Sequence, residues 1–507
     1  MTKINVDSIG IIGAGPGGLA ALYEFLHTNK DGSSTSGGAQ AADPAFSKIV
    51  AFEQKAEAGG IWTPASVQAD LPVPPQHILD SEEYQSPEVV RPRVDPPTGI
   101  EGASIDSPVV ETVGKHGNEL EWSRSGIFPN LFTNIPARFT RYSFMPDEDK
   151  YHDKSRKIYP FLHHQELSQR FSNFIEQEQL NKYIRFNTTV EKVEKNDAGK
   201  WVVSAKRKNG DKNEWYQEEF DAIVVSNGHY TVPHIPKIPG LAEFNKKHPG
   251  VLIHAKSFRG TDEFKDKNVL VVGGSISTAN VLQYIVPVAK KTVNSKRGRH
   301  YVFEFINDAL VSEGITPKGQ ITKIDPESGE VHFEDGTTDV FEKILFSTGY
   351  HYHYPFLADH FKLVNPGNLS RVDGLYLHTF NQADPTLGSA GIAVSQLNFH
   401  TIEASAAALA GVWSGAKTLP TVQEQKDWER KDVEEKGDSI FFHYYSHRDA
   451  KEKFVDKLAP YFPEGRANPL ARDQQYVGEI DEGLEYLKDL FYGLKDKSIK
   501  VEETILA

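Results

Sequence analysis

Cysteine is absent from all 507 residues of the chain. A chain without thiols has no disulfide framework, no thiolate metal site, no cysteine nucleophile and no redox-active dithiol, so disulfide reductases are excluded. Long apolar runs are also absent, since none reaches the roughly 18 residues that a membrane-spanning helix requires. The segment nearest to that length, Thr401 to Gly415, contains Glu403 with many alanines and serines, which suits a helix buried within protein.

Basic side chains are outnumbered by acidic ones, 56 to 70, for a net charge of −14. This balance disfavours nucleic acid or an anionic membrane as the main partner. Lys3 and Asp7 lie beside the first apolar run, so the apolar core of a secretory signal is missing. We therefore expect a cytoplasmic protein. Peripheral contact with the endoplasmic reticulum membrane and assembly into a homo-oligomer stay open.

Short apolar runs recur along the chain, and several end in glycine turns. Some precede segments of helical period, a pattern that indicates α/β units with parallel sheets. We expect strands in SIGIIGAG, KIVAFE, AIVVSNG, NVLVVGG, YVFEFI (Tyr301–Ile306) and ILFSTG. No clustering of side chains predicts a metal site.

The first glycine turn follows the run Ser8 to Ile12 and leads into the helical sequence LAALYEFL. Glycine is required here for three reasons: the tight turn, the close approach of backbone to a pyrophosphate, and the close packing of helix on strand. The N-terminus of the helix then faces the phosphates. Glu53 ends the next predicted strand, where a carboxylate can bind ribose hydroxyls, as in FAD or NAD. The alternative is a glycine-rich turn without a ligand. The candidate residues are Gly13, Gly15, Gly17, Gly18 and Glu53.

The second turn follows Asn268 to Val272 and has hydroxyl side chains where the first has glycines. Such residues at a helix N-terminus can donate hydrogen bonds to phosphate, or they can simply cap the helix. Further along, a hydroxyl and two cations occupy the region where a ribose-binding carboxylate is expected, which suits the 2′-phosphate of NADPH. A solvated basic turn is the alternative. The candidate residues are Gly273, Ser275, Ser277, Thr278, Ser295, Lys296 and Arg297.

Between the two turns lies HPGVLIHAKSF, His248 to Phe258. It resembles the identifying segment of flavin-containing monooxygenases, F-x-G-x-x-x-H-x-x-x-(Y/F), except that His248 replaces the usual phenylalanine. Phe258 favours this class over the related Baeyer–Villiger enzymes, which have tryptophan there. Other family-like segments occur along the chain in the order expected for the family. They are EAGGIW with Gly60 and Trp62, NLFTNIP, FDAIVVSNGHYTVPHIP, FSTGY, and DPTLGSAGIAVSQ, the last of which is similar to the flavin-side segment of fungal and yeast members.

The resemblance implies an NADPH-dependent FAD monooxygenase that uses O₂ to oxygenate small sulfur or nitrogen nucleophiles through a flavin C4a-hydroperoxide. Because the cofactor carries out the difficult chemistry, no catalytic triad or metal is required. A Baeyer–Villiger or N-hydroxylating monooxygenase of the same fold is one alternative. A non-oxygenating flavoprotein that regulates a partner is another.

Within NLFTNIP, Asn134 matches the family asparagine beside flavin and nicotinamide, so it is the predicted catalytic and cofactor-binding residue. Its amide can donate and accept hydrogen bonds at once. The alternative is a structural asparagine in a turn before Pro136. His254 is expected to couple the two domains, either directly in the chemistry or as a structural histidine, and we do not assign it a catalytic role.

The predicted fold is α/β, with two dinucleotide-binding Rossmann-like domains, the NADPH domain being inserted into the FAD domain. We predict an FAD domain at 1–230 and 344–455, an NADPH domain at 231–343, a helical extension at 456–507, and flexible insertions at 28–45 and 63–124.

Overall fold

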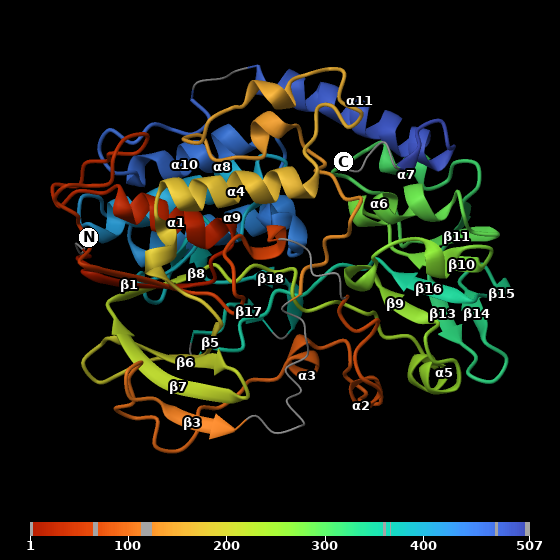
Figure 1. Ribbon diagram of the computed structural model, residues 1–507, viewed down its shortest axis with the longest axis horizontal. Coiled ribbons are helices and arrows are strands. Elements are labelled where there is room, and N and C mark those ends of the chain that lie inside the picture. The colour runs from red at the N-terminus through yellow and green to blue at the C-terminus, as the bar shows by residue number, and fades with distance from the viewer. Residues whose placement is uncertain are drawn as a thin grey trace.

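Two largely parallel sheets organise the computed structural model, which describes residues 4–63, 69–112, 124–357, 361–365, 367–471 and 475–501 (Figure 1). The first sheet has the order β19-β20-β21-β8-β1-β2-β4, and the second has the order β12-β11-β10-β16-β9. The strands of the first are β1 (Ser8–Ile12), β2 (Lys48–Phe52), β4 (Ile184–Arg185), β8 (Ala222–Val225), β19 (Leu375–Tyr376), β20 (Phe380–Asn381) and β21 (Leu387–Ser389); those of the second are β9 (Leu252–His254), β10 (Asn268–Val272), β11 (Lys291–Ser295), β12 (Thr316–Lys318) and β16 (Lys343–Phe346).

Antiparallel strands form smaller sheets beside these two. A four-stranded sheet of order β3-β7-β6-β5 packs below the first sheet in Figure 1, and a three-stranded sheet, β13-β14-β15, flanks the second. Their strands, with two further pairs, are β3 (Val109–Thr112), β5 (Thr188–Lys195), β6 (Trp201–Asn209), β7 (Lys212–Phe220), β13 (Ile321–Ile324), β14 (Glu330–Phe333), β15 (Thr338–Val340), β17 (Val364–Asn365) with β18 (Asn368–Val372), and β22 (Val394–Ser395) with β23 (Tyr444–Tyr445).

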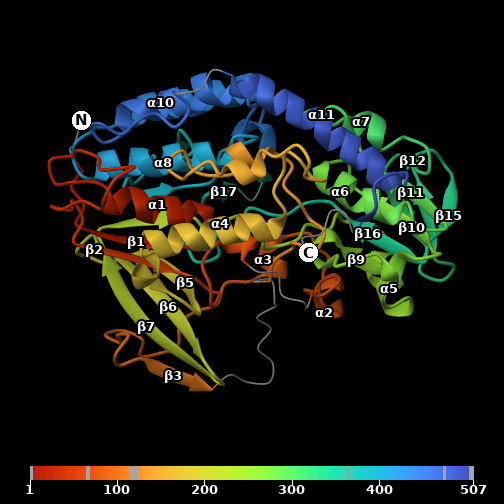
Figure 2. The same cartoon turned by 45° about the horizontal axis from the view of Figure 1, so that its top comes forward.

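Helices cover the first sheet on the side opposite the four-stranded sheet, and α11 extends from there over α6 (Figure 2). Alanine-rich α8 is buried almost throughout and packs on α1, as the sequence predicted for this segment. The helices are α1 (Pro16–Leu26), α2 (Gln76–Leu79), α3 (Pro87–Val90), α4 (His164–Gln177), α5 (Leu241–Lys247), α6 (Ile276–Ile285), α7 (Ile306–Ala309), α8 (Asn398–Trp413), α9 (Val422–Lys436), α10 (Asp456–Leu458) and α11 (Tyr476–Lys495). Within the described ranges, none of them is long and apolar enough to cross a bilayer.

Two sequence expectations are corrected here. Tyr301–Ile306 is not a strand: the segment turns at the surface, Tyr301 is 73% exposed, and α7 begins at Ile306. The strand beside β10 is instead β11, whose single large apolar residue, Val293, gives little strand signal. The boundary at residue 343 also cuts β16, whose residues up to Phe346 pair with β10, so the second sheet continues past that boundary.

The two predicted insertions are partly ordered by contacts with the rest of the chain. Residues 28–45 form no helix or strand, yet Ser34 N–H donates to Glu464 O (2.8 Å) and Ala41 N–H donates to Leu26 O (2.9 Å). In the described parts of 63–124, α2 and α3 form single turns and β3 adds an edge strand to β7. The flexibility of both segments stays a prediction.

The C-terminal segment is joined to the core by a buried ion triad. Arg466 lies between Glu24 of α1 and Glu403 of α8, and the three side chains are 3%, 0% and 0% exposed. Arg466 Nη2 lies 2.7 Å from Glu24 Oε1 and also contacts Glu403 Oε1. Two buried carboxylates repel each other unless a cation lies between them.

We therefore predict that Arg466→Met lowers the free energy of unfolding by about 3–5 kcal/mol, because it leaves two uncompensated buried carboxylates. Urea unfolding followed by circular dichroism measures the change. Arg430→Met, which removes two exposed ion pairs on α9, is the control and should change stability by less than about 1 kcal/mol. Equal effects of the two variants would contradict this account of the triad.

Candidate active site

The first glycine turn joins β1 to α1 through direct contacts between backbone atoms. Gly13 has a φ of 97°, and its N–H donates to Phe52 O at the end of β2 (2.8 Å). A Cβ on Gly13 would lie 2.6 Å from Ser226 O, just after β8, and a Cβ on Gly18 would overlap the Gly13 carbonyl. The start of α1 is thereby held against the end of the sheet, where its free N–H groups face one point.

Gly15 and Gly17 of this turn also lie against backbone from other parts of the chain. A Cβ on Gly15 would lie 3.3 Å from the Cα of Gly60, and a Cβ on Gly17 would overlap the Ala390 carbonyl. Gly60 begins a single 3₁₀ turn that ends at the half-buried Trp62. The turn and the EAGGIW segment, 45 residues apart between Gly15 and Gly60, therefore form one cradle that side chains cannot fill.

Glu53 is positioned by the same backbone. Its carboxylate accepts hydrogen bonds from Ala14 N–H (2.9 Å) and Lys55 N–H (3.0 Å), and its side chain is buried. Burial raises the pKa of Glu53, and these two N–H donors oppose that shift. Each carboxylate oxygen keeps a lone pair for a further donor, so a ribose hydroxyl fits the chemistry of this group.

The second turn repeats the contacts of the first. Gly273 has a φ of 144°, and its N–H donates to Ser295 O at the end of β11 (2.9 Å). A Cβ on Gly273 would overlap Ser347 O, just after β16. Asn294, which sequence reasoning missed, donates its amide to Val271 O (3.0 Å) and Gly273 O (2.9 Å). The only sequence signal for that role was a polar residue near the end of a weak strand.

Four predicted hydroxyl side chains of this turn divide into two kinds. Ser275 and Ser277 are exposed at the N-terminus of α6, and Ser275 makes no capping hydrogen bond, so the helix-capping alternative is not what the structure has. Thr278 is fully buried, and its Oγ1 has no hydrogen-bond partner among the described residues. Ser295 is buried too, and its hydroxyl donates to Gly319 O (2.7 Å).

Opposite charges follow the equivalent strands of the two sheets. Phe52 and Ser295 accept the corresponding glycine N–H bonds, and the residues directly after them are Glu53 and Lys296. Lys296 is half-buried beside Gly274, and burial lowers its pKa, whereas Arg297 is exposed. The first site therefore ends in a carboxylate and the second in two cations.

Asn134 lies in a turn that other residues hold. The Thr133 hydroxyl donates to Ile135 O (2.9 Å), Thr133 N–H donates to Leu162 O (2.8 Å), and Leu162 N–H donates to the Thr133 hydroxyl (3.1 Å). Asn134 is half-buried, and within the described part of the chain its amide has no hydrogen-bond partner. The turn therefore does not depend on the Asn134 side chain for its shape.

His254 has a structural environment. Its Nε2 lies 3.1 Å from Gly349 O, and its Nδ1 accepts the N–H of Lys256 (3.1 Å). Burial lowers the pKa of His254 to about 3, so the ring is neutral at physiological pH. Among the alternatives for this residue, the contacts favour the structural one.

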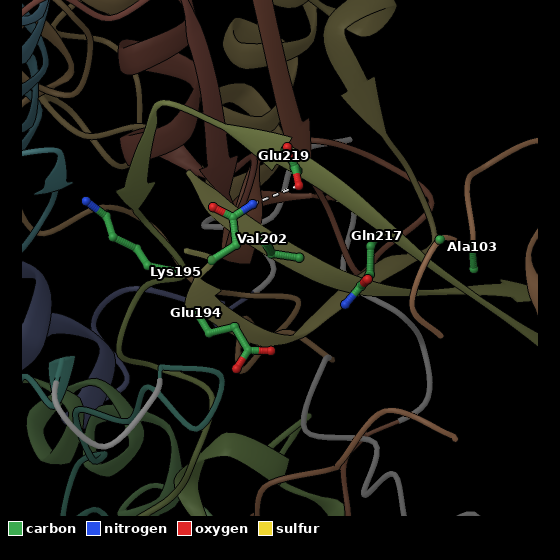
Figure 3. A pocket seen from close by; sticks show the side chains of 8 residues that line it. Ala103, Glu194, Lys195, Val202, Gln217 and Glu219 are labelled. Carbon is green, nitrogen blue, oxygen red and sulfur yellow. Dashed lines mark hydrogen bonds between the residues drawn. The ribbon is translucent and has the colours of Figure 1, made fainter. Parts of the chain in front are cut away.

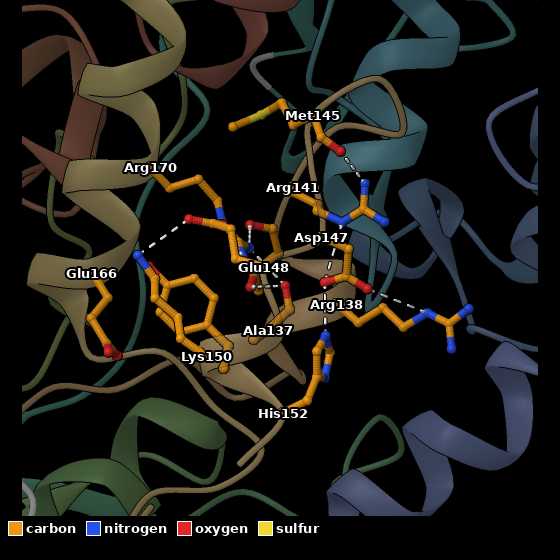
Figure 4. Close-up of polar contacts among 12 residues, drawn as sticks. Ala137, Arg138, Arg141, Met145, Asp147, Glu148, Lys150, His152, Glu166 and Arg170 are labelled. Atoms are coloured by element: carbon orange, nitrogen blue, oxygen red, sulfur yellow. Dashed lines mark hydrogen bonds and ion pairs between the residues drawn. The ribbon is translucent and has the colours of Figure 1, made fainter.

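The molecule also has hollows and polar clusters outside the two turns. A hollow of about 440 Å³ lies on the four-stranded sheet, lined by Glu194, Lys195 and Gln217 among others, and none of its lining residues belongs to either turn (Figure 3). Figure 4 shows a cluster in which Asp147 contacts His152 Nε2 (2.9 Å) and Glu148 pairs with Arg170 (2.8 Å). This cluster fastens the segment after the Asn134 turn to α4.

Comparisons with known proteins agree with this geometry. Residues 110–313 match the model of the flavin-binding monooxygenase-like family. A flavin-containing monooxygenase of Arabidopsis thaliana, FMO GS-OX-like 9, is 30% identical over 81% of this chain and 76% of its own length. The chain belongs to the flavin-containing monooxygenase family. Its match to trimethylamine monooxygenase of Methylocella silvestris is 28% identical over 82% of this chain and 76% of that protein.

The fold of this flavin-containing monooxygenase also matches a solved structure. The superposition on S-allyl-L-cysteine S-oxygenase from Allium sativum covers 98% of this chain and 96% of that protein, with a TM-score of 0.70 and 23% sequence identity. The predicted α/β class with two Rossmann-like domains is confirmed, as is an oxidoreductase that is a flavoprotein monooxygenase. FAD and NADPH, the predicted cofactors, are those of this family. The resemblance to fungal and yeast members stays a prediction.

The residues of this flavin-containing monooxygenase fit both dinucleotides. Each turn has a glycine cradle that a Cβ would fill, and each has a polar group at the adjacent strand end. Gly13, Gly15, Gly17, Gly18, Gly60, Trp62 and Glu53 lie together around the first turn, and Gly273, Ser275, Ser277, Thr278, Lys296 and Arg297 lie around the second. Ser295 differs from the other predicted residues of the second turn, because its hydroxyl donates to the carbonyl of Gly319. Their contacts with cofactors stay predictions.

We predict that Gly18→Ala strongly weakens FAD binding, because the added methyl overlaps the Gly13 carbonyl and moves α1 off the sheet end. The purified variant should be colourless and bind FAD at least about 100-fold more weakly, with its circular dichroism spectrum unchanged. Gly478→Ala is the control, since a Cβ there meets no atom within 4 Å. A yellow Gly18→Ala protein with normal FAD affinity would refute the role of this contact.

Proposed function

We propose that this flavin-containing monooxygenase is NADPH-dependent, binds FAD at the first turn and NADPH at the second, and oxygenates small sulfur or nitrogen nucleophiles. The observation that carries the proposal is the pair of equivalent strand ends that differ in charge, Glu53 at the first turn and Lys296 with Arg297 at the second. A carboxylate suits unphosphorylated ribose hydroxyls, and cations suit a 2′-phosphate.

The substrate class has support from relatives. One is named for trimethylamine and a structural neighbour for S-allyl-L-cysteine, a tertiary amine and a thioether. Bound flavin supplies the redox chemistry, with NADPH as reductant, O₂ as oxidant and transfer of one oxygen atom to the substrate. The protein must therefore bind and orient both dinucleotides and exclude water, and it needs no nucleophile of its own.

Asn134 is the residue to which we assign a chemical role. Its amide has no partner among the described residues, so both its N–H donors and its carbonyl acceptor remain for ligands. An amide held in a rigid turn can hydrogen-bond a polar group without reorganising, which is the condition for stabilising a reacting centre.

Asn134→Ala should therefore keep FAD bound while product formation falls by about 100-fold, as for the loss of one preorganised donor. NADPH oxidation should continue, and its electrons should leave as hydrogen peroxide. Oxygen uptake, peroxide release and product mass are measured together with a thioether and a tertiary amine. The control is Asn173→Ala on the exposed side of α4, which should stay fully coupled. Full coupling in Asn134→Ala would remove Asn134 from the mechanism.

The basic pair tests the choice of coenzyme. Replacing Lys296 and Arg297 together by serine should lower kcat/KM for NADPH by about 10- to 100-fold, in line with roughly 1.5–3 kcal/mol for hydrogen bonds to charged groups. kcat/KM for NADH should change little, because that coenzyme lacks the 2′-phosphate. Arg299→Ser is the control, since Arg299 pairs with Glu304. Equal losses for both coenzymes would place the phosphate elsewhere.

A substrate panel separates the alternatives of the same fold. Thioethers, amines and ketones are supplied to the purified protein with NADPH and O₂, and product masses are recorded. Sulfoxides or N-oxides support the proposal, and an ester from a ketone would support Baeyer–Villiger activity. A yellow protein that neither oxidises NADPH nor forms peroxide would support a regulatory flavoprotein.

A further inference from the structure

A buried ion pair joins the segment that follows the Gly60–Trp62 turn to the edge of the second sheet. Lys256 lies in a single 3₁₀ turn (Ala255–Ser257) directly after β9. Its Nζ lies 3.2 Å from the carboxylate of Asp70, and the two side chains are 2% and 0% exposed. Among the described residues, neither Asp70 oxygen receives a hydrogen bond of good geometry. The contact is therefore mainly electrostatic.

Hydrogen bonds run beside this pair along two chain segments. His254 N–H donates to Pro72 O (2.6 Å), and the Ser257 hydroxyl donates to Asp70 O (3.0 Å) and Leu71 O (2.7 Å). Residues 70–72 therefore lie against 254–257 and place the two charged side chains opposite each other.

The same region is connected to the first turn by three further residues. Arg259 donates to Ser125 O (2.6 Å), and the Ser125 hydroxyl donates to Ile61 O (2.5 Å), in the segment between Gly60 and Trp62. Lys55 Nζ donates to Gly60 O (2.7 Å) and lies in the field of both Glu53 and Asp70. Charges of alternating sign thus lead from Glu53 through Lys55 and Asp70 to Lys256.

Stability alone does not explain the pair. Burial raises the pKa of Asp70 to about 6 and lowers that of Lys256 to about 8, so for each group desolvation outweighs the attraction of its partner. A buried pair of this kind adds little to the free energy of folding, and an apolar or neutral replacement is often equally stable. What the pair does fix is orientation, because it lies where residues 70–72 run against 254–257.

Taking as given the proposed flavin site at the first turn and NADPH site at the second, we propose that Asp70 and Lys256 are positioning residues. Their ion pair fixes residues 70–72 against the edge of the second sheet, beside the Arg259 and Ser125 contacts to the Gly60–Trp62 turn, and so helps to set the distance across which hydride passes from nicotinamide to flavin. The pair acts through the placement of the two sheets.

The pair has a defined pH window. Below about pH 6 Asp70 becomes protonated, so Lys256 loses its negative partner. Above about pH 8 Lys256 becomes neutral, so Asp70 loses its positive partner. The rate of flavin reduction should therefore be bell-shaped between these limits. The other titratable or charged groups that face the pair are Lys55, Arg124, His254, Arg259 and Tyr350.

The test is anaerobic rapid mixing of the FAD-loaded protein with NADPH, followed at the flavin absorbance. Lys256→Met and Asp70→Asn should slow reduction by about 10- to 100-fold, the loss expected from a small misplacement of reacting groups. FAD affinity, and NADP⁺ affinity of the flavin-free protein, should stay within about two-fold, since neither turn is altered. Lys256→Arg should restore most of the rate and move the alkaline limb upward, because guanidinium stays charged.

Lys206→Met is the matched control. Lys206 pairs with Glu191 at 2.7 Å, 5% and 9% exposed, within the four-stranded sheet and away from both turns. Its loss should leave reduction and the pH profile unchanged. If Lys256→Met misfolds, Asp70→Asn with Lys256→Met removes both charges and should fold, yet reduce flavin slowly over a flat pH range.

Slowing of equal size in Lys206→Met and Lys256→Met, or a fall in FAD affinity that accounts for the whole effect, would overturn the positioning role. Wild-type flavin that NADPH does not reduce would overturn the proposed function instead, since that result does not involve the variants.

Discussion

Contact between backbone atoms at two glycine turns sets the positions of the candidate dinucleotide-binding groups. In each sheet a glycine with positive φ lies against the carbonyl of a serine that follows the neighbouring strand, Ser226 or Ser347. Any side chain there would push the helix away from the strand end. With glycine, the free N–H groups of the helix start face the point where an anionic pyrophosphate can bind.

The two turns share the contact of a glycine with the neighbouring strand end, and they differ in the helix start, where Ser275 and Thr278 replace glycines, and in the charge that follows the adjacent strand. Glu53 is buried and held by two N–H donors, whereas Lys296 and Arg297 lie at a more open edge. Under the proposed function, this difference in charge is what selects between a free ribose and a phosphorylated one. The overall charge of −14 has no part in this choice, which is local.

The sequence predicted the parts of the fold that depend on short-range patterns. β1, β2 and β10 are continuous apolar runs, and the glycine turns after β1 and β10 follow their expected course. β11 was missed because its burial comes from polar residues, Thr292, Asn294 and Ser295, whose contacts form only in the sheet. Tyr301–Ile306 was predicted wrongly for the opposite reason, since its apolar residues Phe303 and Ile306 are buried from a turn and the start of α7 rather than from a strand.

Contacts distant in sequence determine how Asn134 is presented, and no local pattern indicates them. Pro136 packs on α11 where a Cβ on Gly483 would lie 2.6 Å from the proline ring, and Arg138 pairs with Glu479 of the same helix (2.5 Å). α11 also packs on α6, which starts at the second turn. One C-terminal helix therefore contacts both the turn that carries Asn134 and the helix that starts at the second turn. Because close-packed interiors transmit strain, the placement of the Asn134 amide relative to the second turn depends on how α11 is packed, even though α11 contributes none of the candidate residues.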